Sequence, residues 1–434
     1  MSISRAKFLR QVYPFKPPST SVDHLVIGGG VIGLSVAAAL VNKAGKDRTT
    51  FLVERRGQLG QETTNSEVIH SGIYYPLGSV KSRLCIQGRD MLYKRCEQFG
   101  IGHKRTGKIV VATSDPQVPY LKKLQAHSTH PSFLTTPGDP STSRITTQFL
   151  RGNEARELEP DLSPKVCGAL LIPSTGIVDS QGLVDSLERE VEDPDYNPSA
   201  SREEDRGEGV IVLGTRVVRI DREESGSGWV VQMETGWEGL GEGEKGEVES
   251  VRADVVVNAA GLGSVSLCEG VVPENELAQL WPVKGNVSRL IYPCPSANVD
   301  HLGTHLTLDL DGHIKFGPDV QTIGTSADAA RDPDFWQSYL APSSSPELIA
   351  AFAHSVQDYL PTIDPCLLSP DYAGIRPNIA PPEAGFSDFL IRHVEQRKGF
   401  IELLGFNSPG LTSCLAVGEV VGEMVGRQVW NKKD

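Results

Sequence analysis

The feature that most constrains the fold is a glycine-rich segment near the N-terminus, in which Gly28, Gly30 and Gly33 stand between an apolar run and an Ala-rich stretch. The run HLVI predicts a β-strand, VIGLSVAAALVNK predicts a helix, and TFLVE predicts a second strand. An order of strand, glycine turn, helix and strand is typical of a parallel sheet covered by helices. We therefore predict that the ordered fold begins near residue 22 with such a unit.

Each glycine of this turn has a physical task. The first permits the tight turn, the second lets the backbone approach a pyrophosphate, and the third permits close helix packing, while the helix N-terminus favours negative charge. Glu54 ends the second predicted strand, about 20 residues beyond the last glycine. A carboxylate at that place accepts hydrogen bonds from the adenosine ribose hydroxyls and repels a 2′-phosphate. The pattern predicts a dinucleotide site.

Later segments favour FAD over a nicotinamide cofactor. A nicotinamide enzyme usually completes its sheet with a second mononucleotide-binding half, whereas this chain supplies RVVRI and VVVNAAGLGS, as long flavoproteins do. Near the C-terminus, GFNSPGLTS begins a long apolar stretch, whose helix dipole would stabilise negative charge on a reduced flavin. An ordinary core helix with a Pro-Gly entrance is the alternative. The expected FAD-binding residues are Gly28, Gly30, Val31, Ile32, Gly33, Glu54, Arg55, Thr64, Asn65, Ser66, Ile69, Val217, Ala260, Gly261, Ser408, Pro409, Gly410, Leu411 and Thr412.

Charge and cysteine usage exclude several classes of function. The 42 basic and 55 acidic side chains give a formal net charge of −13, which argues against a nucleic-acid partner because phosphate binding needs a basic surface. The seven cysteines form no CxxC pair and no cluster with histidine at metal spacing, so we expect reduced thiols in an intracellular protein and no metal site.

The chain also bears on membranes and on location in the cell. No apolar run reaches the ~18 residues that a spanning helix needs, so we expect no transmembrane segment, while peripheral membrane contact stays open. The first 21 residues contain basic but no acidic side chains. This segment is compatible with a mitochondrial leader or with a flexible N-terminal tail, so a mitochondrial location and a cytoplasmic one both remain open.

A chain of 434 residues predicts two joined lobes rather than one small core. The pattern from Ser79 to Phe99 indicates a helix that Gly100 ends. GKIVVAT, RVVRI and GWVVQM read as strands, and LTLDLDGHIKFGP alternates around Asp311-Gly312, a two-residue hairpin signal. We expect an α/β (α+β) fold with a Rossmann-like FAD-binding lobe interleaved with an antiparallel-sheet substrate lobe. The expected ranges are 1–21 for the N-terminal segment, 22–100, 160–264 and 368–430 for the FAD-binding lobe, and 101–159 and 265–367 for the substrate lobe.

A family resemblance rests on several of these motifs together. In order and spacing, the chain is similar to the FAD-dependent L-2-hydroxyglutarate dehydrogenase group of the D-amino-acid oxidase-like superfamily, from about residue 22 to 427. The segments that carry it are VIGGGVIGLSVAAAL, NSEVIHSGIYYPLGSVKSRLCIQG, GKIVVAT, PSTGIVDSQGLVDSL, VVNAAGLGS, LDLDGHIKFGPD and GIRPNI. The resemblance implies a two-lobed architecture, noncovalent FAD and oxidation of a 2-hydroxy acid to a 2-oxo acid by hydride transfer to flavin N5. It leaves the electron acceptor, a quinone or oxygen, undetermined.

Two residues are the main catalytic candidates. His70 in IHSG matches the histidine of an IHGG stretch that lies at the substrate face of the flavin in related glycerol-3-phosphate dehydrogenases. An imidazole suits proton abstraction because its ordinary pKa of ~6.5 lies near the working pH; the alternative is a structural core histidine. Arg376 in GIRP matches an arginine that holds a substrate carboxylate, a task suited to a planar charged fork. Its alternative is a surface salt bridge. Candidates for a second carboxylate are Lys284, His305, Thr307 and Tyr74.

Departures from the group's pattern leave other functions open. Glu67 stands where the group commonly has glycine, and Lys284-Gly285-Asn286 stands where it has an arginine followed by Gly-Glu. Extra negative charge near the flavin, and an ammonium in place of a fork, would alter substrate choice. The alternatives are an amine-oxidising enzyme of the amino-acid or sarcosine oxidase type that forms hydrogen peroxide, and a flavin-binding protein without turnover.

Overall fold

The βαβ unit expected at the N-terminus is present. The computed structural model describes residues 10–43, 47–60, 66–134, 136, 143–197, 206–224, 226–240, 244–285, 289–294, 304–317, 320–323, 335–340, 345–369, 373–381 and 384–430. Strand β1 (Thr20–Ile27) leads through the glycine turn into helix α2 (Val31–Lys43) and then into β2 (Thr49–Val53). β1 pairs in parallel with β2 on one side and with β12 (Glu247–Asn258) on the other, which confirms the predicted parallel pairing around the βαβ unit.

This sheet has eight strands, in the order β10-β11-β12-β1-β2-β9, with β20 paired to β12 and β19 paired to β20. Its remaining strands are β9 (Glu208–Val212), β10 (Thr215–Arg222), β11 (Trp229–Thr235), β19 (Leu390–His393) and β20 (Phe400–Leu404). Both faces of its central strands are buried, because Val26 belongs to the helix-covered core and its neighbours Leu25 and Ile27 belong to the core on the opposite face. A nearly continuous apolar strand is what a parallel sheet covered on both faces requires.

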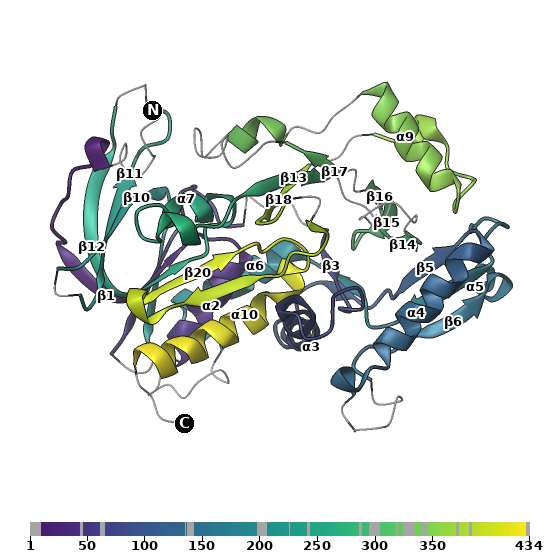
Figure 1. Ribbon diagram of the computed structural model, residues 1–434, viewed down its shortest axis with the longest axis horizontal. Coiled ribbons are helices and arrows are strands. Elements are labelled where there is room, and N and C mark those ends of the chain that lie inside the picture. Colours follow the sequence, from purple (N-terminus) through teal and green to yellow (C-terminus); the bar gives the residue numbers. More distant parts are fainter. Residues whose placement is uncertain are drawn as a thin grey trace.

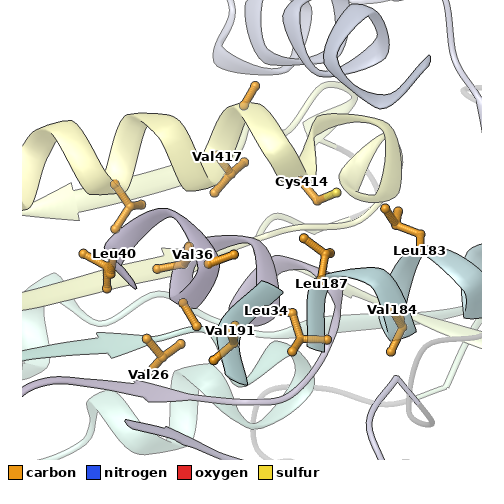
Figure 2. Close-up of a cluster of buried hydrophobic side chains, with 14 of the residues drawn as sticks. Val26, Leu34, Val36, Leu40, Leu183, Val184, Leu187, Val191, Cys414 and Val417 are labelled. Atoms are coloured by element: carbon orange, nitrogen blue, oxygen red, sulfur yellow. The ribbon is translucent and has the colours of Figure 1, made fainter. Parts of the chain in front are cut away.

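Four helices cover one face of the sheet. They are α2, α3 (Val80–Phe99), α6 (Ser180–Glu192) and α10 (Gly410–Met424). Figure 2 shows side chains of α10, such as Cys414 and Val417, above Val36 of α2. A Cβ on Gly418 would lie 2.3 Å from the carbonyl oxygen of Ser35, so glycine permits the close crossing of α10 and α2. The C-terminal apolar stretch thus forms a core helix, and flavin binding by its first turn stays a prediction.

Helix α3 has the ends that the sequence predicts. The Ser79 side chain accepts a hydrogen bond from the Ser82 backbone N–H at its start, and Gly100 ends it with a φ of 67°. A serine cap satisfies an N–H group that has no intrahelical partner, and glycine adopts the left-handed conformation without a Cβ clash.

A second sheet of six strands has the order β16-β15-β14-β5-β7-β6. Its strands are β5 (Lys108–Ala112), β6 (Gln148–Arg151), β7 (Gly168–Ile172), β14 (Arg289–Pro293), β15 (His305–Leu308) and β16 (Ile314–Gly317). All its pairs are antiparallel except β14 with β5, so the expected antiparallel sheet is confirmed. Helix α4 (Val118–Ser128) packs against its strands β5, β6 and β7 (Figure 1). Strand β7 belongs to this sheet although its residues fall within the range expected for the FAD-binding lobe; the lobe boundaries stay a prediction.

The hairpin of β15 and β16 is present, but its expected two-residue turn is wrong. Leu308 pairs with Ile314, so residues 309–313 form the connection. The backbone N–H of Gly312 and both the N–H and ring of His313 bond to Asp309, and Gly312 has a φ of 90°. The side chain of Asp309 closes a longer turn that the Asp-Gly signal alone does not distinguish from a shorter one.

Two small sheets complete the arrangement. One is β3-β8-β4, built from Val68–Ile69, Gly176–Val178 and His103–Lys104, and the other is β17-β13-β18, built from Val320–Thr322, Trp281–Gly285 and Gly374–Asn378. In Figure 1 the latter lies above α10, between the two large sheets. The other helices are α5 (Gly152–Leu158), α7 (Ser264–Cys268) and α9 (Pro346–Gln357), with short helical turns at Asp115–Gln117, Pro131–Phe133, Gly261–Gly263, Glu274–Glu276, Phe335–Tyr339, Pro365–Leu367, Glu395–Arg397 and Val425–Val429. Within the described ranges, none of the helices combines the length and the apolar character that a membrane crossing requires.

Candidate active site

The glycine turn has the shape that a dinucleotide pyrophosphate needs. Gly28 has a φ of 109°, and its backbone N–H donates to the Val53 carbonyl at 2.8 Å. A Cβ on Gly33 would lie 1.9 Å from the Gly28 carbonyl oxygen, so the helix approaches the turn closely only with glycine there. A Cβ on Gly30, in contrast, would meet no atom within 4 Å. The turn is thus closely packed at Gly28 and Gly33 and open at Gly30, which fits a phosphate group at the N-terminus of α2.

Glu54 follows the end of β2 and is buried. One of its carboxylate oxygens accepts from the Gly29 N–H at 2.6 Å and the other from the Arg56 N–H at 2.9 Å. These bonds hold the carboxylate against the glycine turn. Its contact with a ribose hydroxyl stays a prediction.

Some of the other expected cofactor residues lie next to this turn. A Cβ on Gly28 would lie 2.6 Å from the Ala259 carbonyl oxygen, so the segment with Ala260 and Gly261 packs against the turn. Val217 lies in β10, whose first residue, Thr215, donates to the Glu54 carbonyl. Val31 and Ile32 begin α2, and Arg55 lies over the Trp336 ring at 5.4 Å. Ser66 is half-buried, whereas the side chain of Ile69 lies in the hydrophobic core. Thr64 and Asn65 lie outside the described residues.

His70 is connected to the start of α10. Its backbone N–H donates to Thr412 Oγ1 at 3.0 Å, and the same hydroxyl donates to the Val68 carbonyl at 3.1 Å. Its ring Nε2 lies 3.2 Å from Ser408 Oγ. Ser408 is exposed and also hydrogen-bonds Tyr75. Of the expected residues 408–412, Ser408 thus contacts the imidazole and Thr412 holds the backbone of His70 at the start of α10. Whether Pro409, Gly410 and Leu411 contact a cofactor stays a prediction.

The imidazole of His70 has an unusual electrostatic environment. Burial lowers its pKa well below the ordinary value of 6.5, and electrostatic interaction with the basic side chains of Lys108, His305 and Arg376 lowers that pKa further. The fold thus moves the pKa of His70 away from the ordinary imidazole value. A lowered pKa keeps the ring neutral at neutral pH, in the form that accepts a proton. The ring contacts an exposed serine, which differs from the environment of an apolar core histidine.

Arg376 lies on β18, opposite Val283 of β13. Burial lowers the pKa of its guanidinium, and the hydroxyl groups of Tyr292 and Tyr75 oppose that change. No carboxylate of the described residues is among the groups that shift this pKa, and the role of Arg376 stays a prediction. Lys284 occupies the neighbouring position on β13, opposite Ile375; its side chain lies outside the description.

Three other candidates meet around Tyr292 and its strand. Tyr292 stacks on His305 with ring centres 3.8 Å apart, and on Tyr74 with ring centres 6.3 Å apart. The Tyr74 hydroxyl and Thr307 Oγ1 are buried and have no hydrogen-bond partner among the described residues. Thr307 lies two residues beyond His305 on β15, so both point to the same face of that sheet. Unpartnered buried hydroxyls are costly unless a ligand pairs with them.

Sequence reasoning missed Lys108 and Tyr292. Lys108 is the first residue of β5, and all five residues of that strand are buried. The signal was a lysine at the start of a strand that otherwise reads IVVA, because a lysine is almost never fully buried without a partner. Tyr292 in LIYP gave no comparable signal, since an aromatic residue in a strand is ordinary.

Glu67 does not stand free at the site. Its φ is 55°, and its carboxylate accepts from Ser180 Oγ at 3.0 Å at the start of α6. The left-handed backbone explains why a glycine suits this position. We expect Glu67→Gly to change the free energy of unfolding by no more than about 1 kcal/mol, because relief of strain offsets the lost hydrogen bond. Glu67→Ala, which keeps the strain and loses the bond, is the matched variant and should melt at a lower temperature than Glu67→Gly.

The same pair of variants tests the expected effect of Glu67 on substrate choice. Because the carboxylate is bonded to Ser180, neither variant should change the ratio of kcat/KM between two substrates of different charge. Thermal unfolding and steady-state kinetics measure both outcomes. A tenfold change in that ratio would instead place the Glu67 charge at the substrate.

Comparison with known proteins supports the cofactor and the fold. The family model described as FAD dependent oxidoreductase (DAO) matches residues 23–424. The mitochondrial L-2-hydroxyglutarate dehydrogenase of Arabidopsis thaliana is 32% identical over 419 residues, which cover 92% of this chain and 82% of that protein. The L-2-hydroxyglutarate dehydrogenase of Escherichia coli (strain K12) is 26% identical over 427 residues, with 91% of each chain covered.

Solved structures share the architecture. The FAD-bound, dithionite-reduced L-α-glycerophosphate oxidase of Mycoplasma pneumoniae superposes with a TM-score of 0.70 at 19% identity and covers 95% of both chains. The glycine oxidase of Geobacillus kaustophilus gives a TM-score of 0.65 at 20% identity and 96% coverage of both. At such identities these structures establish the fold alone.

Proposed function

This chain belongs to the FAD-dependent oxidoreductase family, and we propose that it oxidises L-2-hydroxyglutarate, or a closely similar 2-hydroxy acid, to the 2-oxo acid. The observation that carries the proposal is the imidazole of His70, which contacts Ser408 and whose pKa is lowered by burial and by Lys108 and Arg376, with no carboxylate among the causes. A site of this kind suits an anionic substrate that must lose a proton. The names of the relatives agree with this class of substrate.

The residues have distinct roles in the proposed reaction. Arg376 holds the carboxylate next to the hydroxyl group with its planar fork. His70 accepts the hydroxyl proton at Nε2, the nitrogen that lies 3.2 Å from Ser408 Oγ. Bound FAD would supply the acceptor for the hydride that leaves the carbon bearing the hydroxyl group. The first turns of α2 and α10, with Glu54, would hold that cofactor, and the open face of Gly30 fits its pyrophosphate.

The test of this function is anaerobic. Purified yellow protein is mixed with L-2-hydroxyglutarate, its D enantiomer, L-lactate, L-malate, glycerol-3-phosphate and a panel of amino acids, and the flavin absorbance is followed. We expect bleaching by L-2-hydroxyglutarate. Reduction by an amino acid alone, with hydrogen peroxide formed in air, would select the amine-oxidising alternative. A flavin that stays oxidised with every donor would select a non-catalytic flavin protein.

The electron acceptor and the location in the cell are finer points of the proposal. We propose a quinone or oxygen as the acceptor, which dye reduction and peroxide formation distinguish. A mitochondrial location is proposed because the relatives from Arabidopsis thaliana and Homo sapiens are named as mitochondrial and because the first 21 residues are basic. Fusion of these residues to a fluorescent protein tests it, and diffuse cytoplasmic fluorescence would contradict it.

The lowered pKa of His70 predicts the acidic side of the pH profile. His70 works as a base only when neutral, so activity is present above its pKa and is lost as the pH falls through it. We expect kcat/KM to stay level through about pH 6.5 and to fall only at distinctly lower pH. The groups that set this pKa face the ring from β5, β15 and β18, namely Lys108, His305 and Arg376. An acidic limb centred at or above about 6.5 would contradict the assignment.

A further inference from the structure

Lys108 is a buried lysine that the reaction described above does not use. Its side chain is 1% exposed. The ammonium nitrogen lies 4.1 Å from the ring centre of Tyr292 and 4.6 Å from that of Tyr74. Contacts with aromatic rings favour a cation, but they compensate only in part for the loss of hydration of a fully buried ammonium. Something else is needed to stabilise the charge at this place.

No anion of the described residues supplies that stabilisation. Lys108 has no ion pair and no hydrogen bond from its ammonium there, and burial lowers its pKa to about 7, with only the Cys85 thiol acting against the change. Lys81 is a useful contrast, because it is also buried but bonds Asn407 Oδ1 at 2.6 Å and interacts with the Asp388 carboxylate. Lys81 is therefore satisfied by the fold, whereas Lys108 is not. A buried ammonium without a counter-ion is typical of a site that receives an anionic ligand.

Lys108 acts on the same imidazole as Arg376, but from another sheet. Both cations lower the pKa of His70, Lys108 from β5 in the six-stranded sheet and Arg376 from β18 in the small sheet above α10. Tyr292 interacts with each of them. Two cations that approach the proposed proton acceptor from separate elements fit two negative charges on one small molecule.

We propose that Lys108 binds the distal carboxylate of a dicarboxylic 2-hydroxy acid, so that Lys108 selects dicarboxylates over monocarboxylates of the same length. The inference rests on the proposed function and deepens it by assigning the specificity to one residue. The unpartnered hydroxyl of Tyr74, whose ring contacts the Lys108 ammonium, offers a hydrogen bond to the same carboxylate. Arg376 then holds the other carboxylate, and His70 lies within the electrostatic reach of both cations.

The experiment measures binding rather than turnover. Glutarate and pentanoate have the same chain length, differ in the distal carboxylate and lack the hydroxyl group, so the holoenzyme cannot oxidise them. We expect wild-type holoenzyme to bind glutarate more tightly than pentanoate in isothermal titration calorimetry. Lys108→Met should lower the glutarate-over-pentanoate affinity ratio by about 10- to 100-fold, the usual loss for a hydrogen bond to a charged group. The matched control is Lys122→Met on α4, an exposed lysine beside the Phe149 ring, which should leave the ratio unchanged.

The outcomes separate this inference from the proposed function. A ratio that Lys108→Met leaves intact overturns the role of Lys108, even if L-2-hydroxyglutarate is oxidised. A ratio that falls as expected upholds that role, even if no 2-hydroxy acid reduces the flavin, in which case the proposed function alone fails. If Lys108→Met does not retain FAD, the glutarate-over-pentanoate affinity ratios of the wild type and of the milder Lys108→Gln variant test the role of Lys108 instead. A wild-type protein that binds pentanoate as tightly as glutarate overturns the inference without any variant.

Discussion

His70→Ala should slow flavin reduction by the 2-hydroxy acid by about 10²- to 10⁴-fold, the usual contribution of general base catalysis. The variant removes the imidazole whose Nε2 lies beside Ser408 Oγ and whose lowered pKa keeps it ready to accept a proton. FAD should stay bound, because the connection of this segment to α10 uses the His70 backbone N–H and Thr412, which the substitution leaves in place. Anaerobic stopped-flow absorbance measures the rate, and the flavin spectrum measures retention.

The matched control for this variant is His103→Ala. His103 is also half-buried, and its Nδ1 bonds the Ile101 carbonyl at 2.9 Å. It is not among the groups that shift the pKa of His70. Its removal should leave the reductive rate unchanged. A His70→Ala protein that reduces as fast as the wild type, or that loses its flavin or unfolds, would show that the imidazole is structural.

Arg376→Met should lower kcat/KM for the 2-hydroxy acid by about 10²- to 10³-fold, chiefly through a raised KM. Two hydrogen bonds between a charged fork and a carboxylate are lost, each worth about 1.5 to 3 kcal/mol, and part of this is recovered by solvent. Arg376→Lys keeps the charge but not the fork and should lose less. Arg376→Met should not destabilise the fold, because it leaves no carboxylate of the described residues unpaired.

Arg392→Met provides the contrast for Arg376. Arg392 pairs with Glu402 at 2.6 Å, and Glu402 is 1% exposed, so the substitution leaves a buried carboxylate without its main partner. We expect a lowered melting temperature with an unchanged KM. If Arg376→Met behaves in this way instead, Arg376 is a structural residue and does not bind the substrate.

The secondary-structure elements that are set by residues close together in the sequence were predictable. The glycine turn, the strands on either side of α2 and the capped helix α3 follow from short-range patterns of apolar residues, glycines and a serine cap. The membership of the family and the FAD cofactor also followed from motifs of this kind. The turn between β15 and β16 was misjudged because the side chain of Asp309 lengthens it, and a local signal does not fix the register of a hairpin.

The sequence by itself determined where the cofactor turn begins, which histidine is the best candidate base and which arginine is the best candidate fork. Only the tertiary structure decided how these groups behave, because burial and long-range electrostatics depend on strands that lie far apart in the chain. The pKa of His70 is lowered by burial and by basic side chains on three different strands, and Lys108 gains its significance from the rings of Tyr74 and Tyr292. Likewise, the left-handed backbone at Glu67 and its bond to Ser180 turn an expected charge at the flavin into a contact with α6. Such properties belong to the packed fold, since no single segment contains the atoms that cause them.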